Sequence, residues 1–183
     1  MDGPFYLDSR APFLTFDFAA VTLATTDKAL YSTAAFPVLG SNYFGFGGKK
    51  LRIRCAGRMT TVATPGNGTF SIYWNNGGDA ALGTIIAASE AFTLVANQTN
   101  APWSIDVTTV VRTLGTTGTM YCSGTCAFAV GAVAARGGII PSVTPAGVTV
   151  DTTLNNIVSV QFKRSGSTAE TMQVQDMDVV AYN

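Results

Sequence analysis

The stretch GKKLRIRCAGRM, residues 48–59, decides the fold class because its side chains alternate between apolar and cationic. The apolar parity holds four residues: Leu51, Ile53, Cys55 and Met59. The opposite parity holds four cations: Lys50, Arg52, Arg54 and Arg58. Successive side chains of a strand point to opposite faces of a sheet. The stretch is therefore predicted to be a strand with one buried face and one cationic face.

Similar alternating segments, separated by Gly, Pro and Asn, fill most of the remaining chain, and no window has a helical period. The clearest are residues 70–75, 103–112, 120–130, 158–163 and 171–182. Turns that recur at such short intervals are typical of a sandwich. We predict an all-β protein, an antiparallel β-sandwich or jelly roll of about eight to ten strands. Residues 19–183 are predicted to form this single domain.

Four local expectations accompany the fold. The turn sequence TPGNG at 64–68 predicts that the strand at 50–59 pairs with the strand at 70–75 as a hairpin. The strands at 103–112 and 120–130 are predicted to form another hairpin, and residues 131–146 resemble a loop. The apolar parity of the last strand changes near Gln175, which predicts a β-bulge or a change of sheet.

Residues 1–18 are predicted to form an extended arm, because Gly3-Pro4 and Ala11-Pro12 each interrupt strand pairing. The arm is rich in aromatic side chains: Phe5, Tyr6, Phe13, Phe16 and Phe18. Exposing so many aromatic side chains on a free arm is unfavourable. The arm therefore packs either on its own domain or on a neighbouring molecule.

Composition indicates burial against other molecules. Apolar residues make up 47% of the chain and charged residues only 12%, whereas a typical domain has about 25% charged residues. The formal net charge is zero, so nucleic-acid binding is not expected. No apolar run is long enough to span a bilayer, and no secretion-signal pattern follows Met1. We therefore expect synthesis in the reducing cytoplasm, no membrane partner, and assembly with further subunits.

Cys55, Cys122 and Cys126 are an odd number of cysteines, which argues against a disulfide framework. Cys122 and Cys126 fall on one predicted strand, where their Cα atoms would lie about 13 Å apart. That separation is too large for a disulfide. Each cysteine is expected to be a small buried apolar residue.

Catalytic chemistry finds little support. The chain has no histidine, which excludes His-dependent catalysis and every His-containing metal site. Asp176 and Asp178 share one strand face, where they would either bind a hard cation or be solvated. Four other carboxylates are candidates for acid–base pairs, but nothing in the sequence brings any two together: Glu90, Asp106, Asp151 and Glu170. No enzyme activity, cofactor or metal is expected.

The cationic face is the most unusual feature of the chain. It is either a solvated sheet face, an interface with a carboxylate-bearing partner, or a phosphate contact. Arginine dominates this face, and its planar fork favours defined pairing with carboxylates. Trp74 and Trp103 share parity with apolar neighbours, so they are expected in the core rather than in a sugar site.

Four segments together resemble one protein family. They are GKKLRIRCAGR (48–58), NAPWSIDV (100–107), VTVDTT (148–153) and VSVQF (158–162). Their combination is similar to small jelly-roll virion proteins of tailed bacteriophages, which decorate or cement the capsid. The resemblance implies a β-sandwich trimer on the outside of a lattice of major capsid protein. The residues predicted to face partners are Phe5, Tyr6, Phe13, Phe16, Phe18, Lys50, Arg52, Arg54 and Arg58.

Two other functions stay open at this stage. The chain is alternatively a tail, fibre or spike-head component of a virion, which would differ in copy number per particle. A carbohydrate-binding adhesion module is the remaining alternative, and it requires Trp74, Trp103 or Tyr73 to be exposed.

Overall fold

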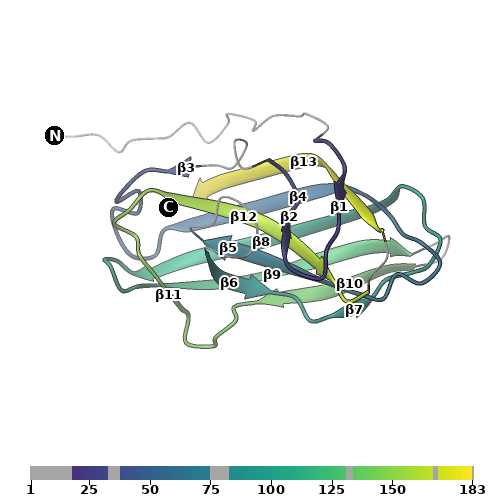
Figure 1. The fold of residues 1–183 in the computed structure, drawn as a ribbon. Helices are drawn as coiled ribbons and strands as arrows, with labels where there is room; N and C mark the ends of the chain where they lie inside the picture. Colours follow the sequence, from purple (N-terminus) through teal and green to yellow (C-terminus); the bar gives the residue numbers. More distant parts are fainter. Residues whose placement is uncertain (1–17, 33–37, 75–82, 131–133, 167–168, 183) are drawn as a thin grey trace.

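The alternating stretch forms β4 (Lys50–Thr60) in the interior of a seven-stranded antiparallel sheet (Figure 1). Its side chains alternate between buried and accessible, as its sequence predicts. β4 pairs along its length with β13 (Thr171–Tyr182) on one side and β8 (Ala101–Thr113) on the other. The computed structural model describes residues 18–32, 38–74, 83–130, 134–166 and 169–182.

The larger sheet has the strand order β1-β13-β4-β8-β9-β10, and β11 also pairs with β9. Its remaining strands are β1 (Val21–Thr22), β9 (Gly118–Val130), β10 (Ala134–Pro141) and β11 (Val148–Val150). The smaller sheet has the order β2-β12-β5-β6, with β3 on β12 and β7 on β5. Its strands are β2 (Lys28–Ala29), β3 (Val38–Leu39), β5 (Asn67–Trp74), β6 (Thr84–Ala88), β7 (Phe92–Thr93) and β12 (Asn156–Arg164).

This arrangement confirms the predicted all-β, antiparallel sandwich. The described residues contain no helix, and eight of their strands are five residues or longer. β8 and β9 form the predicted hairpin. The predicted irregularity in the last strand is also present, because the pairing of β13 with β4 shifts register between Val174 and Asp176.

Two local predictions were wrong. β4 and β5 do not form a hairpin: β4 pairs with β13 and β8, whereas β5 pairs with β12 and β6 in the other sheet. The turn at 64–68 instead carries the chain from one sheet to the other. The amides of Leu94 and Ser165 donate hydrogen bonds to the carbonyls of Gly66 and Asn67 in this turn.

Part of the expected loop at 131–146 is β10, which pairs with β9 although it contains Gly137 and Gly138. Cross-strand pairing outweighs the weak strand propensity of glycine there.

The core lies between the two sheets and is centred on Phe70. Its ring stacks on Phe128 with centroids 5.3 Å apart and meets Phe162 edge-on at 4.9 Å. Trp103 lies 5.4 Å from the same ring. These contacts join β5 and β12 of the smaller sheet to β8 and β9 of the larger one, so the aromatic cluster fastens the two layers together.

A buried ion pair ties the edges of the sandwich. Arg164 Nε lies 3.0 Å from Glu170 Oε2, and both side chains are buried. The same Nε donates to the carbonyl oxygen of Leu23 at 3.0 Å, and the Leu23 amide donates to the Glu170 carbonyl. The pair therefore holds the turn between β12 and β13 against the segment that leads from β1 to β2.

Gly57 is required by the close approach of two backbones. A Cβ atom at this position would lie 1.8 Å from the carbonyl oxygen of Gln173, next to the bulge of β13. We expect Gly57→Ala to lower the free energy of unfolding by about 2–3 kcal/mol, because the strand must shift to relieve the overlap. Urea unfolding monitored by tryptophan fluorescence measures this effect.

Gly40→Ala is the matched control, since a Cβ atom there meets nothing within 4 Å. An equal loss of stability in both variants would contradict the steric explanation for Gly57.

Candidate functional site

The outer face of the larger sheet carries the cationic row of β4. Lys50, Arg54 and Arg58 are exposed and Arg52 is half-buried. The cross-strand register places Asp106 of β8 opposite Arg54 on one side and Asp178 of β13 opposite it on the other. The structure therefore gathers opposite charges from three strands that the sequence separates widely.

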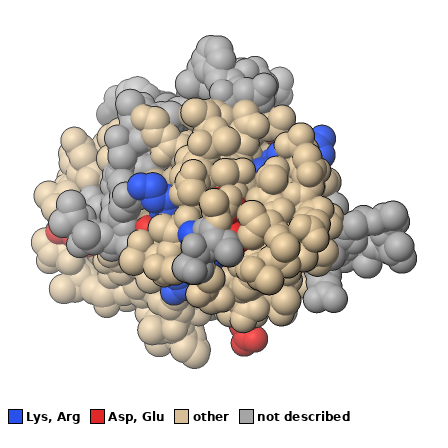
Figure 2. All heavy atoms as spheres, turned by 45° about the vertical axis from the view of Figure 1, so that its right-hand side comes forward, with Lys and Arg blue, Asp and Glu red and all other residues tan. Residues whose placement is uncertain are grey.

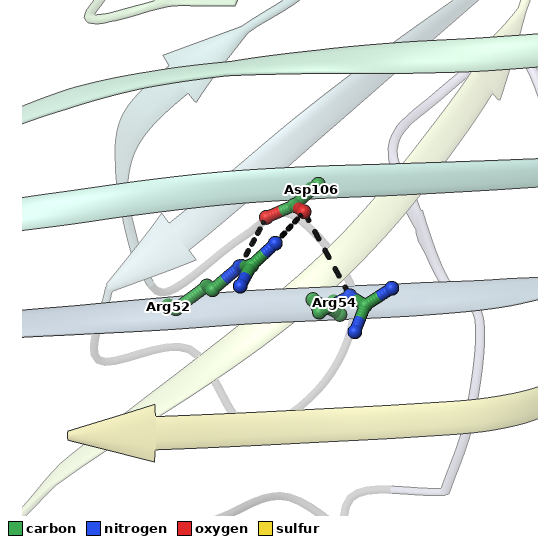
Figure 3. A network of polar contacts seen from close by, with 3 residues as sticks. All are labelled: Arg52, Arg54 and Asp106. Atoms are coloured by element: carbon green, nitrogen blue, oxygen red, sulfur yellow. Dashed lines mark hydrogen bonds and ion pairs between the residues drawn. The ribbon is translucent and has the colours of Figure 1, made fainter.

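Arg52, Arg54 and Asp106 form an ion cluster at the centre of this face (Figure 3). Arg52 Nε donates to Asp106 Oδ1 at 2.8 Å, and Arg52 Nη2 donates to Oδ2, so the pairing is bidentate. Arg54 Nε lies 3.7 Å from the same Oδ2. The hydrogen bond from the Arg52 guanidinium holds the pKa of Asp106 below its ordinary value. The carboxylate thus orients two arginines that would otherwise repel each other.

Arg58 occupies the far part of the same row and has different partners. Its Nε donates to Gln175 Oε1 at 3.2 Å, and its Nη1 donates to the Asn100 carbonyl at 3.4 Å. Both contacts are with neutral groups and are exposed. The positive charge of Arg58 is therefore presented at the surface more openly than that of Arg52.

Among the aromatic residues predicted to face partners, the structure describes Phe18. Its amide donates to the Val174 carbonyl at 3.1 Å, and its ring lies 5.7 Å from that of Tyr31. Phe18 is thus half-buried against its own sandwich. Phe5, Tyr6, Phe13 and Phe16, with the rest of the predicted arm up to residue 17, lie outside the described residues.

The aromatic residues considered for a sugar site are in the interior. Trp74 and Trp103 are buried, as predicted, and so is Tyr73. Trp74 packs 5.7 Å from the ring of Phe44, and the Tyr73 hydroxyl donates to buried Asp27 at 2.9 Å. None of the three offers a ring face on which a sugar could stack.

The three cysteines are buried and unpaired with one another, as predicted. Burial raises the pKa of the Cys122 thiol to about 12, and it also raises the pKa of the Cys55 and Cys126 thiols. Thiols that stay protonated and inaccessible are poor nucleophiles, so these residues act as apolar packing groups.

Other kinds of site find no support among the described residues. No three Cys, Asp or Glu side chains in these ranges come together as metal ligands would. No helix there is long and apolar enough to cross a membrane. An apolar pocket beside Phe92 and Phe128 has a cavity volume of about 30 Å³, which is well below the roughly 300–1,000 Å³ of small-molecule sites.

Sequence reasoning found the cationic row but missed its organising carboxylate. Asp106 was considered only as a possible catalytic acid, because its pairing with β4 depends on a register between distant segments. A signal did exist: Asp106 has the parity opposite to the buried residues Trp103, Ile105 and Val107, so it had to point outward.

Comparisons with known proteins give no assigned family. No family model matches the chain, and no curated protein matches it. Two solved structures have related shapes. A Lotus tetragonolobus seed lectin has 9% sequence identity and a TM-score of 0.46, with 87% of this chain and 83% of that chain covered. A legume lectin-like domain from Entamoeba histolytica has 7% identity and a TM-score of 0.32, with 93% and 97% covered.

Both similarities are too weak to bear on function, and the β-sandwich class rests on the strands and registers described above. Neither structure is a phage decoration protein. The resemblance inferred from the sequence is therefore supported only as far as its β-sandwich fold.

The Asp106 cluster predicts a small, pH-dependent contribution to stability. The pKa of Asp106 is lower in the folded state than in the unfolded state. The ion pair therefore stabilises the fold fully above the unfolded pKa of about 4, and this stabilisation is lost as the pH falls through the folded pKa. Asp106→Asn should cost no more than about 1 kcal/mol at pH 7, because the pair is partly exposed. Urea unfolding of both proteins at pH 7 and pH 3 tests this. A difference that does not shrink at pH 3 would contradict it.

The buried thiols predict resistance to modification. A soluble aromatic disulfide reagent should label none of Cys55, Cys122 and Cys126 within minutes in the native protein, because each thiol is buried and protonated. All three should react after denaturation in guanidinium. Rapid labelling of one thiol under native conditions would show that its strand opens locally.

Proposed function

We propose that the chain is a non-enzymatic virion structural protein that binds the outside of a major capsid lattice and stabilises it. The observation that carries this proposal is the outer face of the larger sheet, where cations of β4 and carboxylates of β8 and β13 form an ordered pattern of charge. Charged residues make up only 12% of the chain, and Figure 2 shows another face of the molecule, on which Lys, Arg, Asp and Glu are sparse. A surface of this kind suits burial against other subunits better than permanent solvation.

The arrangement of functional groups also favours assembly over catalysis. Arg52, Arg54 and Asp106 lie on an open sheet face and not in a cleft, and their charges are held by each other. Such a face presents a fixed pattern of donors to a partner at little cost in side-chain entropy. Binding of many copies to the assembled shell, and not to its free subunits, would stabilise the shell by mass action.

Two further elements belong to the same proposal. Self-association, with a trimer favoured, would bury apolar surface under closed symmetry. A role in a tail, fibre or spike head is compatible with the same surface and differs in copy number. The carbohydrate-binding alternative is disfavoured, because the three aromatic residues that it requires are buried.

Binding to capsids tests the proposal directly. Empty capsids that lack this protein, prepared from the virus that encodes it, should co-sediment the purified chain at a stoichiometry of hundreds of copies per particle. Light scattering should give a trimeric mass for the unbound protein. No binding to capsids would overturn the proposed function, and a few copies per particle would favour the tail or spike role.

Arg58→Glu should weaken this binding because Arg58 is an exposed cation of the predicted interface, and Lys163→Glu on the smaller sheet is its charge-matched control. Equal binding by the Arg58→Glu variant and the wild type would remove this part of the face from the interface.

A further inference from the structure

Four large apolar side chains are exposed at one end of the sandwich. They belong to β3 and to the loops between β3 and β4, β8 and β9, and β11 and β12, which lie together at the left of Figure 1. Their exposed fractions are 62% for Val38, 52% for Phe46, 40% for Leu114 and 53% for Leu154. The described residues expose six large apolar side chains in all, so most of them collect here. We call these four residues the apolar tip.

Hydrogen bonds between the loops hold the apolar tip in one arrangement. The Gly48 amide donates to the Val111 carbonyl at 2.6 Å, and the Gly115 amide donates to Thr152 Oγ1 at 2.9 Å. The Asn42 amide donates to the Thr152 carbonyl at 3.2 Å. These contacts join all three loops near the exposed side chains. The tip is therefore a preorganised surface, which lowers the entropy lost when a partner binds.

The charges around the apolar tip are mainly positive. The tip is flanked by three cations: Lys49, Lys50 and Arg112. Tyrosine rings position two of them. Lys49 Nζ lies 4.3 Å from the centroid of the Tyr43 ring, and the guanidinium carbon of Arg112 lies 4.8 Å from the centroid of the Tyr121 ring.

The one carboxylate of these loops, Asp151, already accepts hydrogen bonds from the Thr153 amide and hydroxyl at 2.8 and 2.7 Å. The complementary partner is an apolar recess with carboxylates at its rim.

We propose that the apolar tip inserts into such a recess on the capsid protein and anchors the chain to the shell. This inference rests on the proposed function and names the contact that it uses. A rigid tip whose cations are partly held by tyrosine rings fits a shaped protein surface. An anionic membrane is the less favoured partner, because three cations and four aliphatic or phenyl groups provide weak lipid binding.

The experiment uses the double variant Phe46→Ser/Leu154→Ser of the full chain in co-sedimentation with empty capsids that lack this protein. Because both side chains are more than half exposed, the variant should keep the thermal midpoint of the wild type. We expect its dissociation constant for capsids to rise at least about tenfold, as expected when central apolar contacts are lost. Lys50→Glu should weaken binding and reduce its sensitivity to salt.

Ile139→Ser is the matched control, because Ile139 is 69% exposed but lies on β10, away from the apolar tip. Unchanged binding by the double variant, or an equal loss in the Ile139→Ser control, would overturn the tip assignment while leaving capsid binding itself intact. Absence of wild-type binding would instead overturn the proposed function. Vesicles of phosphatidylcholine and phosphatidylserine are tested in parallel with capsids. If the wild type binds these vesicles but not capsids, and the double variant does not bind the vesicles, the tip is a lipid-binding site and the proposal is overturned.

Discussion

The structure depends on the fixed register of β4 between β13 and β8. Moving β4 by one residue would turn Ile53 toward solvent and Arg54 into the core. Pairing on both sides prevents this, because each neighbour has its own alternating face to bury. The same constraint that builds the core therefore places every cation of the strand on the outer face. Core packing and the pattern of surface charge are two results of one register.

The chain has few charged residues, and two of its ion pairs have different structural roles because of where they lie. Arg52 and Arg54 share the carboxylate of Asp106 at the surface, whereas Arg164 and Glu170 are paired in the interior, where the two sheets meet at an edge. The surface pair adds little stability but shapes the outer face. The interior pair is costly to break, because removing one partner leaves a buried charge. A chain with only 12% charged residues thus uses several of them for structure.

The smaller sheet shows how tertiary context changes the meaning of a pattern. Ser159 and Gln161 alternate with core residues of β12, so their parity alone suggests a solvated face. Both are fully buried, and Ser71 on the neighbouring strand β5 is buried as well. Alternation reports which side of a strand a residue occupies. It does not report whether other parts of the molecule cover that side.

The sequence by itself determined the all-β class, the orientation of β4, the burial of Trp74 and Trp103, and the irregularity near Gln175. These features follow from side-chain parity, which is a local property. Only the tertiary structure decided that β4 and β5 lie in different sheets, that Asp106 organises the cationic row, and that four distant segments form the apolar tip. Each of these depends on pairing between segments far apart in the chain, and parity does not select a partner among many similar strands.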